Sequence, residues 1–296
     1  MKDGIAHFFS PLELRRLSGL PVASRFTVEG AQLGAHRSHL RGQSLEFSDY
    51  RAYVAGDDLR RLDWRAFARS ERLYLRQYEQ ECNLRVHLLV DASGSMAYGY
   101  PPRPGKHETA ARIAAAVAYA TVMQHDTAAL GLFDAAVRDR IPAGGGAEHL
   151  RLLCNRLAAN QPGKGTNIAQ TLNQFAASIR RRALVVIISD LMDDIEKVRH
   201  ALAHFRRRRH DVILYQVLDP AELEFPFEGD TAFTDLETGA QMTVNPRELR
   251  GAYLKRMEEF LFECRQACAN LDVDYQLVRT DADLPALLHR HLARRR

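Results

Sequence analysis

Residues 85–96 have the sequence RVHLLVDASGSM, in which a short apolar run ends at Asp91 and a loop of small residues follows. Residues 183–190, ALVVIISD, repeat this arrangement, because the most strongly apolar run of the chain ends at Asp190. Neither run alternates apolar with polar residues as a half-buried strand does. Continuous apolar runs are typical of strands covered on both faces, so we expect both strands at the centre of a parallel sheet.

Strand-like and helix-like segments alternate on either side of these two runs. This alternation predicts an α/β fold with a doubly wound, mostly parallel sheet flanked by helices. Further strands are expected at 127–133, 137–141, 211–218 and 273–278, with 137–141 as a candidate edge strand. Helices are expected at 107–124, 148–159, 166–179, 194–207, 246–270 and 284–293, and an inserted hairpin at 222–245. Ligands of such sheets bind beyond the carboxyl ends of the strands, so we expect the functional residues there.

Five oxygen-bearing side chains lie in the loops expected at these strand ends: Asp91, Ser93, Ser95, Thr166 and Asp190. The loops converge if the two central strands are neighbours. A set with no His or Cys suits a hard cation such as Mg²⁺, with Mn²⁺ or Ca²⁺ as alternatives. It leaves a coordination position for water or for a partner's carboxylate. The alternative interpretation is a capped turn and a chance pair of aspartates.

The five-residue set resembles the metal-ion-dependent adhesion site of von Willebrand factor A domains, over about residues 85–293. The upstream motifs resemble the signature of the domain-of-unknown-function 58 family, in which a von Willebrand A-like domain follows: GQSLEF (42–47), YRAY (50–53), GDDLR (56–60) and LDWR (62–65). The resemblance implies that Ser93 and Ser95 bind the metal through their hydroxyls and Thr166 directly or through water. Asp91 and Asp190 would act largely through bound waters.

The family resemblance also implies partners. Members of the family are thought to act with MoxR-type AAA+ ATPases in chaperone-like maturation of other proteins, and a client protein would supply an acidic residue to the metal. The loop PGKGT at 162–166 lacks the spacing of a Walker A motif, so ATP hydrolysis would belong to the partner. One residue departs from the adhesion-site pattern: Leu191 follows Asp190, where many adhesion domains have glycine.

Composition divides the chain into a family-specific N-terminal segment at 1–81, expected to pack on the main domain, and a von Willebrand A-like domain at 82–296. Five residues of the first segment stand out: Arg51, Asp57, Arg60, Asp63 and Trp64. They are either a docking surface for the ATPase or a structural ion-pair knot that ties the segment to the main domain. The mixture of acids, bases and one Trp fits both interpretations.

We expect a non-enzymatic, Mg²⁺-dependent protein-binding module that serves as an adaptor or co-chaperone. The alternative is a Mg²⁺-dependent hydrolase that uses the Asp91/Ser93 loop, although the second aspartate of phosphohydrolases is replaced by Ser93 and no Gly-x-Ser-x-Gly motif is present. Nucleic-acid binding through the arginine clusters at 180–182, 206–209 and 294–296 is a third possibility. These clusters lack interleaved aromatics and follow helical patterns, so we expect helix ends and no nucleic-acid partner.

The chain has 296 residues, of which 46% are hydrophobic and 26% charged, and a net charge of +4. These values are typical of a globular protein. The longest uncharged apolar stretch, at 113–123, is too short to span a bilayer, and the N-terminus lacks a secretory signal, so we expect a cytoplasmic protein with no membrane span. The four cysteines form no Cys-x-x-Cys pair and are expected to be reduced and buried.

Overall fold

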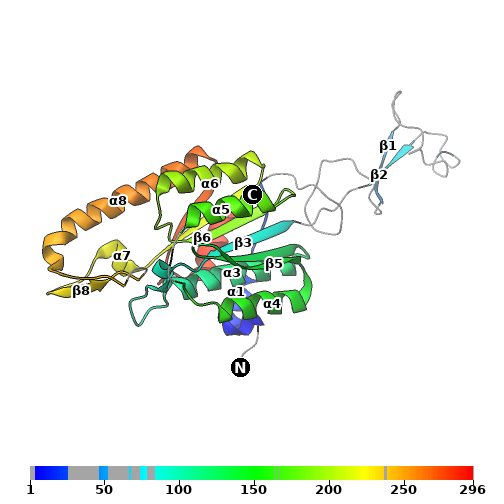
Figure 1. The fold of residues 1–296 in the computed structure, drawn as a ribbon. Coiled ribbons are helices and arrows are strands. Elements are labelled where there is room, and N and C mark those ends of the chain that lie inside the picture. The colour runs from blue at the N-terminus through cyan, green and yellow to red at the C-terminus, as the bar shows by residue number, and fades with distance from the viewer. Residues whose placement is uncertain are drawn as a thin grey trace. The chain divides into compact units, whose positions relative to one another are not determined.

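The computed structural model describes residues 4–25, 47–52, 67, 74–78, 84–163, 165, 167–236 and 239–295 (Figure 1). The chain divides into two compact units, one formed by residues 1–25 and 85–296 and the other by residues 26–84. The boundary predicted between residues 81 and 82 lies near this division, whereas residues 1–25 belong to the larger unit. In the smaller unit, strands β1 (Phe47–Ala52) and β2 (Tyr74–Tyr78) pair antiparallel, with Arg51 opposite Leu75.

The larger unit contains a six-stranded sheet with the strand order β10-β7-β6-β3-β4-β5. Its strands are β3 (Arg85–Asp91), β4 (Thr127–Phe133), β5 (Val137–Gly144), β6 (Leu184–Ser189), β7 (Asp211–Leu218) and β10 (Asp274–Arg279). All neighbouring pairs are parallel except β4 and β5, which are antiparallel. The predicted doubly wound, mostly parallel sheet is therefore confirmed, and β5 is the predicted edge strand.

Burial explains the continuous apolar runs. Every residue of β6 and β7 is buried, whereas in the edge strand β5 only Ile141 is buried and the other residues are exposed or half-buried. On one face, Val185 and Leu214 pack with Phe175 and Phe205 from the covering helices. The helices on this face are α5 (Ile168–Ser178), α6 (Ile195–Arg207) and α8 (Pro246–Asn270). The opposite face is covered by α3 (Lys106–Met123), α4 (Gly146–Ala159) and α9 (Leu284–Ala293).

Gly131 lies in the middle of β4, where the ring of Phe175 leaves no room for a side chain. A Cβ atom there would lie 2.5 Å from two ring carbons of Phe175 and 3.0 Å from a methyl carbon of Leu89. Gly131→Ala is therefore expected to lower the free energy of unfolding by about 1–3 kcal/mol, because the core would be overpacked. Denaturant titration measures the change.

Gly251→Ala is the matched control for this substitution. Gly251 lies inside the exposed part of α8, and nothing lies within 4 Å of the position that its Cβ would take. Alanine in a helix interior is favoured over glycine, so this variant should be more stable by up to about 1 kcal/mol. The expectation for Gly131 would be wrong if both variants changed stability in the same direction.

The N-terminal residues of the larger unit consist of a 3₁₀ helix, η1 (Gly4–His7), and helix α1 (Pro11–Leu17). Ser10 and Glu13 form a capping box that starts α1, and Glu13 also makes an ion pair with Arg112 of α3. Arg25 then donates from its backbone N–H to Asp211 at the start of β7. These contacts hold residues 4–25 on the main domain.

The arginine clusters follow helices, as the sequence predicts. Arg206, near the end of α6, donates to the backbone oxygens of Leu271 and His210. Arg295, just after α9, is buried and makes ion pairs with Asp211 and Asp274. These arginines serve intramolecular contacts, which favours the helix-end interpretation.

The segment expected as a hairpin at 222–245 begins differently. Residues Pro220–Glu224 form a short helix, α7, because Asp219 and Glu222 make a capping box and Pro220 occupies the first turn. The hairpin follows as β8 (Thr231–Thr234) and β9 (Gln241–Val244). The prediction was therefore wrong for the start of the segment, and Glu222 belongs to a helix.

Two further expectations concern membranes and cysteines. None of the helices in the described part of the chain combines the length and apolar character that a membrane span requires. Cys154, Cys264 and Cys268 are free and buried, and burial raises the pKa of each thiol to about 12. The prediction of reduced, buried thiols is confirmed for these three, while Cys82 lies outside the described residues.

Candidate functional site

Strands β3 and β6 are parallel neighbours in the sheet, so the two predicted aspartates lie side by side at the carboxyl ends of these strands. Asp91 is the last residue of β3, and Asp190 directly follows β6. The hydroxyl of Ser189 donates to Asp91 Oδ2 over 2.6 Å, and both aspartates are fully buried. The expected convergence of these two strand ends is thus confirmed.

The Asp91–Ser95 loop curls so that its polar groups face one another. The carboxylate of Asp91 accepts a hydrogen bond from the backbone N–H of Ser93 (2.8 Å). The hydroxyl oxygens of Ser93 and Ser95 lie 3.1 Å apart. Neighbouring ligands of an octahedral Mg²⁺ with bonds of 2.0–2.1 Å lie about 2.9 Å apart. The spacing of the two hydroxyls is therefore close to that of two adjacent magnesium ligands.

The third loop of the predicted site, which precedes α5, packs closely on the first. The backbone N–H of Gly163 donates to the carbonyl of Ala92 over 2.6 Å, and a Cβ atom on Gly163 would lie 2.4 Å from Asp134 Oδ2. Asn167 caps α5 by accepting from the N–H of Gln170. Thr166, the remaining predicted ligand, lies outside the described residues.

Burial and the negative charge of Asp190 raise the pKa of Asp91 from 3.8 to about 7, although hydrogen bonds from Ser189 and Ser93 oppose the shift. Two carboxylates that are buried together cannot both ionise without cost unless a cation compensates them. The two buried carboxylates therefore favour the binding of a cation at the carboxyl ends of β3 and β6.

Lys106 supplies one such cation, and the sequence prediction missed it. Its ammonium donates to Asp190 Oδ2 (2.8 Å) and to Glu222 Oε1 (2.7 Å), and only 1% of its side chain is exposed. Burial alone would lower the pKa of Lys106, but the charges of Asp190 and Glu222 outweigh burial and raise it. Asp190 thus has a buried counter-charge from within the chain.

Glu222 is the second residue that the prediction missed. Its Oε2 accepts from the backbone N–H of Asp219 (2.8 Å) in the capping box of α7, and its carbonyl accepts from the hydroxyl of Tyr253 (2.9 Å). Burial raises the pKa of Glu222, and the charge of Lys106 opposes this rise. Glu222 therefore links the helix after β7 to the edge of the sheet that holds Asp190.

Leu191, the residue that departs from the adhesion-site pattern, has a backbone conformation that favours glycine. Its φ is 61°, in the left-handed region that glycine adopts without steric cost and that a branched residue avoids. The buried side chain and a hydrogen bond from its N–H to Ser189 Oγ (2.9 Å) hold this conformation. These contacts hold the bend of the loop that presents Asp190.

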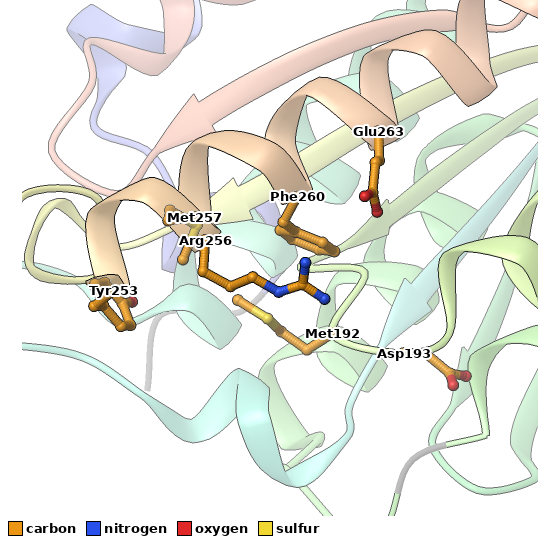
Figure 2. A pocket seen from close by; sticks show the side chains of 7 residues that line it. All are labelled: Met192, Asp193, Tyr253, Arg256, Met257, Phe260 and Glu263. Atoms are coloured by element: carbon orange, nitrogen blue, oxygen red, sulfur yellow. The ribbon is translucent and has the colours of Figure 1, made fainter. Parts of the chain in front are cut away.

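A pocket of about 460 Å³ lies beside the site, between α8 and the loop that follows Asp190. Figure 2 shows that this loop contributes Met192 and Asp193, while α8 contributes the other lining side chains: Tyr253, Arg256, Met257, Phe260 and Glu263. Methionine and aromatic side chains make most of its wall. The pocket thus offers apolar surface two residues from Asp190.

The donors at this edge fit a hard cation bound by hydroxyls and water. Ser93 and Ser95 offer hydroxyl oxygens at suitable spacing, and Asp91 and Asp190 offer charge. Within the described residues, no group of three or more His, Cys, Asp or Glu side chains is placed to hold a metal ion. A metal here would therefore depend on serine hydroxyls and water together with the two carboxylates.

The N-terminal candidate residues are placed only in part. Arg51 lies in β1, whereas Asp57, Arg60, Asp63 and Trp64 lie outside the described residues. The docking surface and the ion-pair knot therefore both stay predictions.

The chain is similar to two mycobacterial proteins over nearly its whole length. The uncharacterized proteins Rv1480 of Mycobacterium tuberculosis and Mb1516 of Mycobacterium bovis are each 28% identical to it over 287 residues, which cover 95% of this chain and 89% of the relative. Among solved structures, the conserved hypothetical protein BatB from Bacteroides thetaiotaomicron superposes with a TM-score of 0.51 at 15% identity, over 72% of this chain and 98% of that chain. This likeness concerns the fold, which is von Willebrand A-like.

The family match extends over both parts of the chain. The family described as "Protein of unknown function DUF58" matches residues 49–260, which include the YRAY, GDDLR and LDWR motifs and the whole stretch from Asp91 to Asp190. The chain therefore belongs to the DUF58 family.

Proposed function

We propose that this chain is a Mg²⁺-dependent protein-binding module. Ser93 and Ser95 would hold the metal through their hydroxyls, Asp91 and Asp190 would act through bound waters, and Thr166 would complete the set. When bound, the metal supplies an electrophilic position that a carboxylate of a partner protein can occupy. The observation that carries this proposal is the pair of serine hydroxyls 3.1 Å apart beside two buried carboxylates.

Binding rather than catalysis fits the contacts of the candidate nucleophiles. The hydroxyls of Ser93 and Ser95 lie within hydrogen-bond distance of each other, and both carboxylate oxygens of Asp91 accept hydrogen bonds from within the protein. Hydrogen bonds to both oxygens make this carboxylate a weaker nucleophile, because the oxygen that attacks would have to weaken or lose its own hydrogen bond. The site suits recognition of an acidic group more than hydrolysis.

The family resemblance suggests the partners. We propose that the chain acts as an adaptor or co-chaperone of a MoxR-type AAA+ ATPase, and that a client protein supplies the acidic residue. The pocket lined by Met192, Tyr253 and Phe260 would add apolar contact area beside that acidic residue.

Ser95→Ala tests the metal site directly. The variant removes one hydroxyl ligand without adding bulk, so we expect its affinity for Mg²⁺ to fall by more than about tenfold. Isothermal calorimetry measures both proteins. Ser178→Ala, at the end of α5, is the matched control and should bind Mg²⁺ like the wild type.

Capture of a purified MoxR-type ATPase, with and without a chelator, tests the partner. In this two-protein assay an acidic residue of the ATPase would take the client's place at the metal, so wild-type capture should be lost with chelator, and Ser95→Ala should capture little ATPase under either condition. Equal Mg²⁺ binding by wild type and Ser95→Ala would reject the site. Capture that persists under chelator would reject the metal bridge while leaving the partnership intact.

A further inference from the structure

Lys106 places a fixed positive charge at the candidate metal site. Its buried ammonium lies 2.8 Å from Asp190 Oδ2, and the ring of Tyr98 lies over it with a centroid distance of 5.8 Å. An ammonium in a dry environment loses its water shell, so it remains there only because the two carboxylates replace that shell. The structure therefore binds a cation to Asp190 without any metal.

Asp190 already holds one cation, the ammonium of Lys106, and would have to share its carboxylate with a metal. Its Oδ2 accepts from Lys106, and its Oδ1 accepts from the backbone N–H of Met192 (3.1 Å). Both oxygens are thus already engaged by the protein. Like charges repel strongly in a buried environment, so a divalent ion near Asp190 and the ammonium of Lys106 oppose each other.

Glu222 gives Lys106 a second carboxylate at nearly the same distance, 2.7 Å. Glu222 does not depend on the metal site for its position, because the capping box of α7 and the hydroxyl of Tyr253 hold its backbone and carboxylate. Lys106 therefore keeps one buried partner if it gives up Asp190.

We propose that Lys106 is a tethered counter-cation that competes with a divalent metal for Asp190, and that Glu222 holds Lys106 when the metal binds. This proposal rests on the proposed metal site and assigns its regulation. Lys106 lowers the resting metal affinity, and Glu222 raises it by holding the ammonium away from Asp190. An acidic partner that ligates the metal then adds the binding energy that retains it.

The test is calorimetric titration of Mn²⁺ into wild type, Lys106→Met and Glu222→Gln. Lys106→Met should bind Mn²⁺ about tenfold tighter or more, since a neighbouring charge shifts an ionic equilibrium by one to three powers of ten. Glu222→Gln should bind it several-fold more weakly, because Lys106 is left with Asp190 alone. If Lys106, Asp190 and Glu222 had only a structural role, both variants would bind Mn²⁺ more weakly. Opposite changes in affinity therefore distinguish competition from a structural role.

Controls keep the result interpretable. Lys197→Met changes an exposed lysine of α6 and should leave Mn²⁺ binding unchanged. If Lys106→Met does not fold even with Mn²⁺, the Mn²⁺ affinity of Glu222→Gln is the test. Unchanged or tighter Mn²⁺ binding by Glu222→Gln overturns the proposal. Unchanged or weaker binding by folded Lys106→Met also overturns it.

The outcome for the wild type separates the two proposals. Wild-type binding that Ser95→Ala abolishes supports the metal site, whatever Lys106→Met does. Binding by Lys106→Met but not by wild type supports the competition and shows that the resting site excludes metal. No binding by any variant rejects the metal site and the competition together.

Discussion

Lys106→Met is expected to lower the free energy of unfolding of the metal-free protein by about 3–5 kcal/mol. The substitution leaves Asp190 without its buried counter-charge and removes one partner of Glu222, whose side chain is only 14% exposed. A buried charge that loses its partner retains the full cost of its desolvation, which is why the loss exceeds that of a surface pair. Guanidinium titration in the presence of a chelator measures it.

Two comparisons give this expectation its specificity. Lys197→Met breaks an exposed pair with Asp194 and should change stability by less than about 1 kcal/mol. Adding Asp190→Asn to Lys106→Met should recover part of the lost stability, because no unpaired carboxylate then remains at that position. A loss below about 1 kcal/mol for Lys106→Met would contradict the interpretation of Lys106 as a buried counter-charge.

Asp91 is expected to make the metal-free protein less stable as the pH rises from about 4 to 7, and Asp91→Asn should remove this contribution. Burial lowers the pKa of His87 and of His210 to about 4, so these two histidines contribute with the opposite sign, and the contribution of Asp91 is the difference between wild type and Asp91→Asn. Unfolded Asp91 loses its proton near pH 3.8, whereas the folded protein holds that proton up to about pH 7. Between these values the folded state binds the extra proton, so raising the pH favours the unfolded state. Above pH 7 both states are ionised and the contribution becomes constant.

The size of this effect follows from the two pKa values. A pKa of about 7 in place of 3.8 corresponds to at most about 4 kcal/mol, and Asp91 is fully buried. Denaturant titrations at pH 5 and pH 8 with chelator measure the difference for wild type and Asp91→Asn. Asp230→Asn, in an exposed loop, should keep the wild-type dependence. The same pH dependence in wild type and Asp91→Asn would contradict the raised pKa.

Local sequence information was sufficient to predict much of the fold. The run that ends at Asp190 is continuous and free of charge, and the shorter run that ends at Asp91 is apolar over residues 88–90, so both indicate central strands of a covered sheet. The position of both aspartates at one edge then follows from parallel pairing. The predicted site also has a contiguous part, Asp91 to Ser95, because alternate residues of one short loop can face a common point.

Lys106 and Glu222 could not be found in this way. The partners of Lys106 lie 84 and 116 residues away in sequence, and only the packing of α3, β6 and α7 brings them together. A weaker signal was present: a lysine in the first turn of a helix opposes the helix dipole and needs another reason to be there. The pattern Asp219-Pro-Ala-Glu222 likewise contains the capping box that makes α7 helical.

The strand order also determines when this protein can mature. Ser189 and Asp91 are 98 residues apart, so at roughly 5–20 residues per second about 5–20 s separate their synthesis on a ribosome. Chain segments that must close such long loops before they pair fold slowly. The pair of Asp211 and Arg295 forms at a later point of synthesis, because Asp211 itself follows Ser189 and its buried partner is 84 residues further along. The buried polar contacts of Asp91 and Asp211 therefore form late in synthesis, and the nascent chain exposes its apolar strands until then.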